Sequence, residues 1–138
     1  MEQVKLNWRG PYRLDRAFEA EAGKDWGIYA ICRKWAGATE SVLNIGLAYF
    51  QELGQRLKQK KWLNDLRGEI TVRFAAVELE RGSKHSRQRS EDIECLLIYY
   101  HKPKYNIRCK KRYVGRQLEI TNTGRRGPIE GVVRSTNL

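Results

Sequence analysis

The chain has 138 residues, a length that suits one compact domain able to bury about two-thirds of its extended surface. Its 27 Lys and Arg residues outnumber 16 Asp and Glu residues, and the net charge of +11 favours a polyanionic partner, either nucleic acid or an anionic membrane surface. The longest apolar or aromatic run, residues 95–100, is far shorter than the roughly 20 residues of a membrane-spanning helix, and the N-terminus has no apolar stretch typical of a signal peptide. We therefore expect a basic domain without a membrane partner.

The cysteines and histidines are few. Cys32, Cys95 and Cys109 are odd in number and far apart in the sequence, which argues against a disulfide framework. Two histidines and the absence of any C-x-x-C pair argue against a structural zinc site. A reducing cytoplasm is the expected compartment.

The first part of the chain favours strands. Residues 1–26 are mixed, with turn signals at Gly10-Pro11 and Gly23, and form either an N-terminal arm or an extra strand. Residues 27–32 and 41–46 are rich in β-forming residues, so we expect two short strands joined as a hairpin.

A helix is predicted next, because Phe50, Leu53 and Leu57 fall at i, i+3 and i+7. Arg56 and Lys60 share another face of this helix. The two basic side chains therefore point in a common direction.

A third strand and a second helix follow. Apolar residues alternate through residues 69–79, which predicts the strand. Ser90 precedes two acids and is typical of a helix N-cap. Apolar residues at i, i+3, i+4 and i+7 from Ile93 continue the helix, and Pro103 should end it by about His101.

The predicted order is β-β-α-β-α, with a further possible strand at 118–121. It indicates an α+β fold, a small central antiparallel sheet of three core strands flanked by helices. We expect residues 1–138 to form a single domain with an N-terminal extension at 1–25 and a basic C-terminal extension at 108–138.

Glu94 is the most informative acid, because it lies beside the apolar stripe of the second helix and hence at the edge of the core. A lone carboxylate in basic surroundings suits a one-metal phosphodiester hydrolase, in which oxygen ligands hold a hard cation and nearby cations attract the phosphate. Taken alone, this pattern is more simply explained by an ion pair between Glu94 and an arginine.

Five sequence elements change that interpretation. In order they are Gly27-Ile28-Tyr29, Asn44-Ile45-Gly46, Arg56 on a helix, Glu94 followed by Leu97-Ile98, and Lys102-Pro103-Lys104-Tyr105-Asn106. This ordered set resembles the GIY-YIG nuclease superfamily over residues 26–107. The resemblance implies a three-stranded antiparallel sheet flanked by helices and DNA endonuclease activity that depends on one divalent cation, Mg²⁺ or Mn²⁺.

The resemblance also implies roles for individual residues. Tyr29 would orient or deprotonate the attacking water, and Gly46, like Gly27, would serve as a backbone position of its motif. Arg56 would stabilise charge on the phosphate. Glu94 would bind the metal, and Asn106 would tie the active-site loop by hydrogen bonds. The plain alternatives are a buried strand tyrosine, a solvated arginine and a turn asparagine.

Two positions depart from the family pattern. Asn44 stands where the second motif begins with tyrosine, and an amide cannot ionise as a phenol does. Either one tyrosine suffices, or Tyr49 swings in, or activity is weak or absent. Lys60 stands where many members have histidine; it can bind phosphate but is a poor base near neutral pH unless its pKa falls.

Other basic residues predict DNA-binding surfaces separate from this site, the plain alternative being solvated surface charge. They are Arg81, Lys84, Arg87 and Arg89 in a loop at 81–89, Lys102 beyond the second helix, and Arg108, Lys110, Lys111 and Arg112 in the run 108–112.

Three other functions stay open. The first is a DNA-binding module without catalysis on the same fold, which Asn44 favours. The second is an RNA-recognition-type sheet, suggested by residues 67–74, although Glu69 and Thr71 replace the stacking aromatics. The third is a protein-binding or structural domain whose charge only aids solubility.

Overall fold

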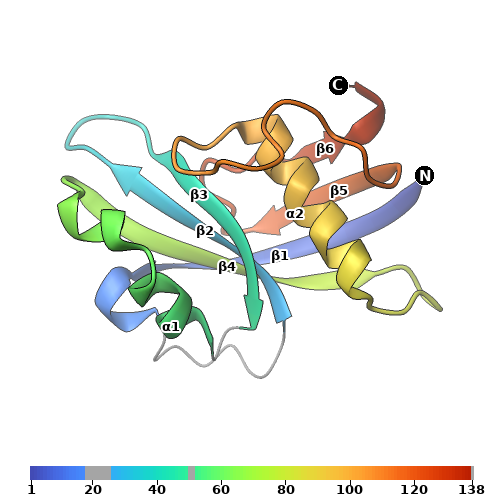
Figure 1. The fold of residues 1–138 in the computed structure, drawn as a ribbon, viewed down its shortest axis with the longest axis horizontal. Helices are drawn as coiled ribbons and strands as arrows, with labels where there is room; N and C mark the ends of the chain where they lie inside the picture. Colours follow the sequence, from blue (N-terminus) through green and yellow to red (C-terminus); the bar gives the residue numbers. More distant parts are fainter. Residues whose placement is uncertain (18–25, 50–51, 138) are drawn as a thin grey trace.

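A computed structural model describes residues 1–17, 26–49 and 52–137 (Figure 1). One sheet contains six strands in the order β3-β2-β4-β1-β5-β6. The strands are β1 (Glu2–Arg13), β2 (Trp26–Lys34), β3 (Ser41–Tyr49), β4 (Glu69–Leu79), β5 (Leu118–Gly124) and β6 (Val132–Arg134). The α-helices are α1 (Leu53–Lys58) and α2 (Arg87–His101), and short 3-10 helices are η1 (Leu14–Arg16), η3 (Lys61–Asp65) and η4 (Ser135–Asn137).

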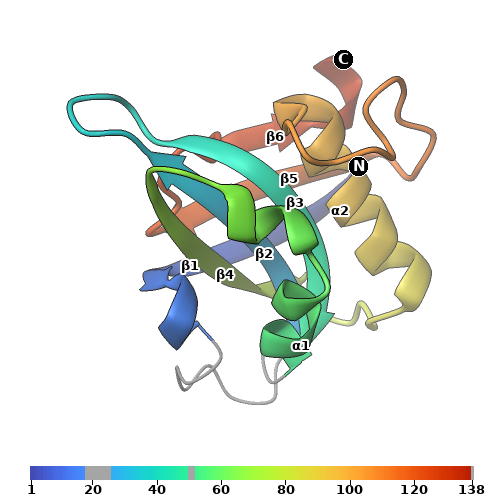
Figure 2. The ribbon, with the colours of Figure 1, turned by 60° about the vertical axis from the view of Figure 1, so that its left-hand side comes forward.

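The expected fold class is wrong in size and in strand direction. The three expected strands exist as β3, β2 and β4, which are antiparallel neighbours. They make up only half of a strongly curled, mixed sheet, in which β1 runs antiparallel to β4 and parallel to β5 (Figures 1 and 2). The molecule is therefore mostly strand, not a small three-stranded sheet flanked by helices.

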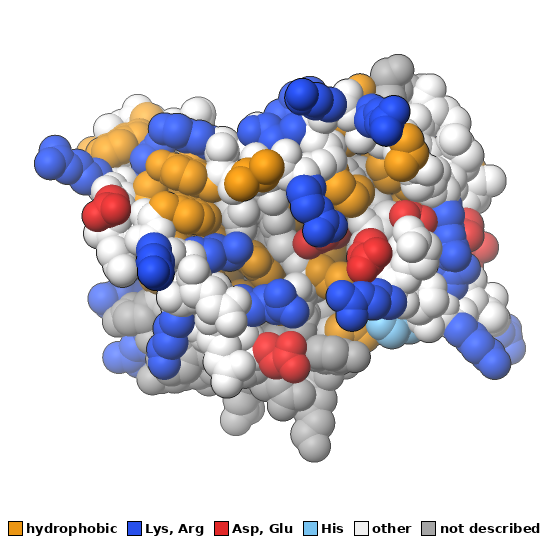
Figure 3. Space-filling model, in the orientation of Figure 1, with side chains coloured by type: hydrophobic (Ala, Val, Ile, Leu, Met, Phe, Trp, Pro, Cys, Tyr) orange, Lys and Arg blue, Asp and Glu red, His pale blue; other side chains and the backbone are white. Residues whose placement is uncertain are grey.

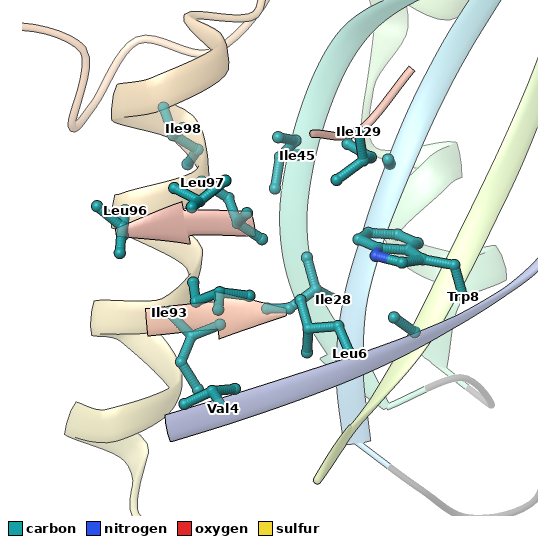
Figure 4. Packing of buried hydrophobic residues seen from close by; sticks show 14 of the residues in the cluster. Val4, Leu6, Trp8, Ile28, Ile45, Ile93, Leu96, Leu97, Ile98 and Ile129 are labelled. Atoms are coloured by element: carbon teal, nitrogen blue, oxygen red, sulfur yellow. The ribbon is translucent and has the colours of Figure 1, made fainter. Parts of the chain in front are cut away.

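The strand that enlarges the sheet is β1. Of the two structures expected for the N-terminal residues, an arm or an extra strand, the extra strand is the one found. Val4, Leu6 and Trp8 are almost completely buried and alternate with exposed residues, as the two-residue period of a strand requires. Their side chains point toward α2, where Val4 lies near Ile93 (Figure 4). Burial of this apolar row explains why the N-terminal segment is a central strand and not an arm.

The Gly10-Pro11 pair does not form the expected turn. It lies inside β1, where the register with β4 shifts between Arg9 and Tyr12, so the strand continues through a bulge. Gly10 has a φ of 111°, a conformation that favours glycine. The other turn signal, Gly23, lies outside the described residues.

The second helix begins one turn earlier than expected. Its N-cap is Ser86, whose side chain accepts a hydrogen bond from the Arg89 N–H at 3.2 Å, and not Ser90. Ser90 is buried and its hydroxyl donates to the Ser86 carbonyl. Arg87 and Arg89 consequently lie on α2 and not in a loop, while the end of the helix at His101 is confirmed.

The first helix is shorter than expected. Leu53 and Leu57 of α1 are buried, but the helix ends at Lys58, before Lys60. Phe50, the other residue of the predicted stripe, lies outside the described residues. Within the described ranges neither helix is long and apolar enough to cross a bilayer.

Two apolar clusters lie on opposite faces of the sheet. One joins α2 to β1, β5 and β6 and contains Ile28 and Ile45. The other contains Tyr29 and joins α1 and η3 to β2 and β4 (Figure 2). Because β3 is an edge strand, the two faces of the sheet meet beside it.

The central position of β1 can be tested through its buried row. Replacing Leu6, which is 0% exposed, by alanine should lower the free energy of unfolding by about 2–5 kcal/mol because it leaves a cavity. Replacing the neighbouring exposed Lys5 should change it by no more than about 0.5 kcal/mol. Urea unfolding of both variants measures the difference, and equal, small effects would show that β1 is a peripheral arm.

Candidate active site

An open cavity of about 410 Å³ lies beside the edge strand β3. We call it the edge cavity. All six residues that the sequence marks as catalytic line it: Tyr29, Asn44, Arg56, Lys60, Glu94 and Asn106. Gly46 also lines it, whereas Gly27 lies elsewhere, with its α-carbon so close to β4 that a Cβ would lie 2.0 Å from the Ala75 carbonyl oxygen.

Tyr29 reaches this cavity because Gly46 has no side chain. The two residues are paired across β2 and β3, and a Cβ built on Gly46 would lie 2.2 Å from both Cζ and Oη of Tyr29. The end of the phenol therefore occupies the space that any other residue at position 46 would fill. Burial, and then the carboxylate of Glu94, raise the pKa of Tyr29 to about 12, so its hydroxyl is protonated at neutral pH.

Glu94 approaches the cavity from α2, on the other side of the sheet. Burial raises the pKa of its carboxyl, while Arg108, the N–H of Leu47 and Arg56 favour the charged form. Glu94 makes no direct salt bridge in the described part of the chain, and Arg87 pairs with Glu91 at 3.0 Å. An ion pair of Glu94 with Arg87 is therefore ruled out, whereas Arg108 and Arg56 attract the carboxylate without a direct salt bridge.

Asn106 fixes the segment that follows α2 against β3. Its Oδ1 accepts from the Ile45 N–H at 2.8 Å, and its Nδ2 donates to the Ile45 carbonyl at 2.9 Å. The N–H of Tyr105 donates to the Leu43 carbonyl at 2.8 Å. The Asn106 side chain thus satisfies the outward-facing N–H and C=O of Ile45. The next outward-facing N–H of the edge strand, that of Leu47, is the one that interacts with Glu94.

Asn44 contributes a buried amide to the same cavity. It is 5% exposed, and its Nδ2 lies 3.5 Å from the Tyr105 carbonyl oxygen. Its Oδ1 is buried without a hydrogen-bond partner among the described residues. The side chain of Tyr49, the other candidate for the missing tyrosine, lies outside the described part of the structure.

Cationic side chains surround the carboxylate. Lys60 Nζ lies 5.9 Å from the centre of the Tyr29 ring, and its pKa is lowered by burial and by Arg56, against an opposing effect of Glu94. Arg87 and Arg108 line the cavity as well, so these two members of the predicted binding surfaces are part of the candidate site and not separate from it. Figure 3 shows Lys and Arg side chains around the hollow on this face.

The other predicted DNA-binding residues are not gathered in this way. Arg89 pairs with Glu2 at 3.1 Å and donates to the Lys84 carbonyl, which ties α2 to β1. Lys102 Nζ donates to the Lys110 carbonyl and lies 3.9 Å from the centre of the Tyr99 ring. Exposed residues outside the edge cavity are Arg81, Lys84, Lys111 and Arg112.

A disulfide contradicts the expectation from cysteine spacing. Cys95 and Cys109 are joined at an S–S distance of 2.05 Å, and Cys32 is buried and free. After α2 the backbone turns at Lys102, which has a left-handed conformation, and the chain returns along the helix. The basic run that begins at Arg108 is thereby held beside Glu94, the neighbour of Cys95. The position of Arg108 two residues after Asn106 was the sequence signal that could have placed it here.

The residues of the edge cavity fit one hard divalent cation. Mg²⁺ is usually held by one or two carboxylates together with substrate phosphate oxygens and water, and Glu94 offers such a carboxylate. In the described ranges no group of three or more His, Cys, Asp and Glu side chains is found.

Comparisons of the chain with protein-family models, with curated proteins and with solved structures found no match. The family resemblance of the motifs therefore stays a prediction.

The contact between Gly46 and Tyr29 predicts strong coupling between the two positions. Gly46→Ala should destabilise the native protein by about 1–3 kcal/mol, because the buried ring has to move. In a Tyr29→Ala background the same substitution should be tolerated better by at least about 0.5 kcal/mol. A double-mutant cycle measured by urea unfolding checks this coupling, and additive effects would contradict the placement of the ring.

The pKa of Glu94 predicts a pH-dependent stability effect. Because folding raises this pKa, the charged carboxylate destabilises the native state once the pH exceeds its ordinary value of 4.5. Glu94→Gln should therefore raise the melting temperature at pH 8 and have little effect at pH 4. Glu78→Gln, an exposed substitution on β4, is the control, and a native protein more stable than Glu94→Gln at pH 8 would refute the shift.

Proposed function

We propose that this protein is a metal-dependent endonuclease that hydrolyses DNA phosphodiester bonds by in-line attack of water at a one-metal site. The observation that carries the proposal is the meeting of Tyr29, Arg56 and Glu94 in one cavity, although they come from β2, α1 and α2. The proposed cofactor is one Mg²⁺ or Mn²⁺ ion, and the proposed partner is DNA.

Glu94 would hold the cation together with oxygens of the DNA phosphate. Such a cation, when bound, supplies Lewis-acid stabilisation of the phosphate and of the leaving oxygen. Burial makes Glu94 suited to this task, because a poorly solvated carboxylate gains more from a nearby cation than a hydrated one does.

Tyr29 and Asn44 are suited to position the attacking water. The raised pKa of Tyr29 makes its hydroxyl a hydrogen-bond group at neutral pH and not a ready base. Asn44 lines the same cavity, but its unpartnered Oδ1 is fully buried, so it can accept from the attacking water only after the side chain shifts. In the reaction one water is consumed: its oxygen bonds to phosphorus, the bond from phosphorus to the leaving oxygen breaks, and the proton that the water loses to solvent is balanced by one that the leaving oxygen takes from solvent.

Arg56 and Lys60 would stabilise the charge that develops on the phosphate. Arg56 is exposed, and its guanidinium presents a planar fork that matches two phosphate oxygens. Arg87 and Arg108 add positive charge around the same space. This arrangement favours a phosphate group over a neutral substrate.

Binding without cleavage is the second candidate function. It is favoured by Asn44 in place of a tyrosine and by the pKa of about 12 for Tyr29, because the site then lacks a phenol that ionises easily. The two functions differ in one measurable respect, the conversion of supercoiled DNA.

Cleavage of supercoiled plasmid in Mg²⁺ or Mn²⁺ tests the proposal. The native protein should convert the plasmid to nicked or linear forms, and Arg56→Ala and Glu94→Gln should lower the rate by about 100-fold or more, because each removes charge stabilisation of the transition state. Both variants should still retard DNA on a gel.

The matched controls are Lys58→Ala on the exposed side of α1 and Glu78→Gln on β4, which should cleave at the native rate. Equal cleavage by the native protein, Arg56→Ala and Glu94→Gln would indicate a contaminating nuclease. Retardation of DNA without any cleavage would favour the binding module.

A further inference from the structure

A second cavity, of about 320 Å³, adjoins the edge cavity. We call it the side cavity. Three residues line both cavities: Leu47, Arg56 and Arg87. The two spaces are therefore neighbours across a shared boundary that carries two guanidinium groups.

The walls of the side cavity are partly aromatic. Trp26, the first residue of β2, and His85, just before α2, have ring centroids 3.6 Å apart and an interplanar angle of 31°. His85 Nδ1 lies 3.1 Å from the hydroxyl of the buried Ser90, which fixes the imidazole in place. Ala48 adds an apolar surface beside these rings.

Apart from the carboxylate of Glu52, which repels an anion, the lining has the chemistry of a nucleotide site. A nucleobase is flat and largely apolar on its faces, and aromatic side chains are the usual surfaces on which it stacks. The phosphate attached to its sugar is anionic and suits Arg56 and Arg87 at the shared boundary, where Arg87, 90% exposed, would exchange its pairing with Glu91 for the phosphate. Partial desolvation, and then the positive charge of Arg89, lower the pKa of the exposed His85, which favours the uncharged imidazole.

We propose that the side cavity receives the base of the nucleotide next to the phosphate that is cleaved. This inference rests on the proposed function, because it places the cleaved phosphate in the edge cavity. A base that is stacked and paired inside a duplex cannot enter a cavity without leaving the helix. The substrate class is therefore DNA with an unpaired or readily extruded nucleotide beside the cleaved bond.

Binding to three labelled DNA hairpins in EDTA tests the inference without cleavage. One hairpin is fully paired, one has a single unpaired nucleotide, and one has an abasic residue in place of that nucleotide. Fluorescence anisotropy should show that the native protein binds the hairpin with the unpaired nucleotide roughly 10-fold more tightly than the other two. Equal affinities for all three would overturn the inference.

Variants connect this preference to the side cavity. Trp26→Ala and His85→Ala should each weaken or abolish the preference, and Trp26→Phe should keep most of it because the stacking surface is retained. Trp35→Ala is the matched control, since Trp35 is 45% exposed and lies outside both cavities. A preference that survives both Trp26→Ala and His85→Ala in folded protein would place the base elsewhere and overturn the inference.

Two further measurements distinguish DNA from free nucleotides as the source of the base, and failure of the side-cavity inference from failure of the proposed nuclease function. Deoxyadenosine monophosphate at the same concentration as the hairpin should not compete, and full competition would show that free nucleotides, not DNA, supply the base. With Mg²⁺ the cut should map to the bond next to the unpaired nucleotide, and a cut elsewhere would overturn the inference while leaving nuclease activity established. Absence of any cut with a retained preference in EDTA would overturn the proposed function alone.

Discussion

The edge cavity depends on one close contact at the edge of the sheet, where the ring of Tyr29 lies over the backbone of Gly46. Tyr29 belongs to the cluster on the α1 face, whereas Glu94 comes from α2 on the opposite face. A phenol on one face can approach a carboxylate on the other only past the last strand, and only where that strand has no side chain. Both conditions are met here, because β3 is the last strand of the sheet and Gly46 has no side chain.

The exposed backbone groups of β3 also bind the loop after α2 and the carboxylate of Glu94. Unpaired N–H and C=O groups of an edge strand attract other strands unless they are covered. Here Asn106 and Tyr105 satisfy the groups of Ile45 and Leu43, and the next N–H outward, that of Leu47, donates to Glu94. The loop after α2 and the carboxylate are thus positioned by one strand, and the disulfide between Cys95 and Cys109 adds a covalent link between helix and loop.

Electrostatics and burial act together in this cavity. Burial raises the pKa of Glu94 and lowers the pKa of Lys60, so the protein destabilises the charge on both side chains. Neither shift is removed by a direct ion pair of Glu94 in the described part of the chain. A bound cation together with a bound phosphate would compensate both charges at once, which is the physical basis for proposing a phosphodiester substrate.

Local patterns in the sequence were sufficient to predict part of this structure. Content of β-forming residues identified β2 and β3, alternation identified β4, and helical periodicity identified most of α2, since those patterns depend on neighbouring residues. The order of the motifs selected residues that line one cavity, although nothing in their spacing required the ring of Tyr29 to cross Gly46.

Other features depend on contacts between distant residues. The alternation of Val4, Leu6 and Trp8 is visible in the sequence, but the parallel pairing of β1 with β5 joins opposite ends of the chain, and Gly10-Pro11 suggested a turn where the strand only bulges. Cys109 reaches Cys95 because the chain reverses after α2, which the spacing of the cysteines does not reveal. Ser90 was mistaken for the N-cap because acids follow it, whereas Ser86 makes the capping hydrogen bond.

Metal binding by Glu94 can be tested by anomalous diffraction from crystals of the native protein grown with Mn²⁺ and a short DNA whose phosphates resist hydrolysis. We expect a manganese peak at coordination distance from the Glu94 carboxylate, roughly 2.1 Å, with a DNA phosphate between it and Arg56 and with the Tyr29 hydroxyl on the same side. A manganese ion bound away from Glu94, or DNA bound on another face of the molecule, would contradict this expectation.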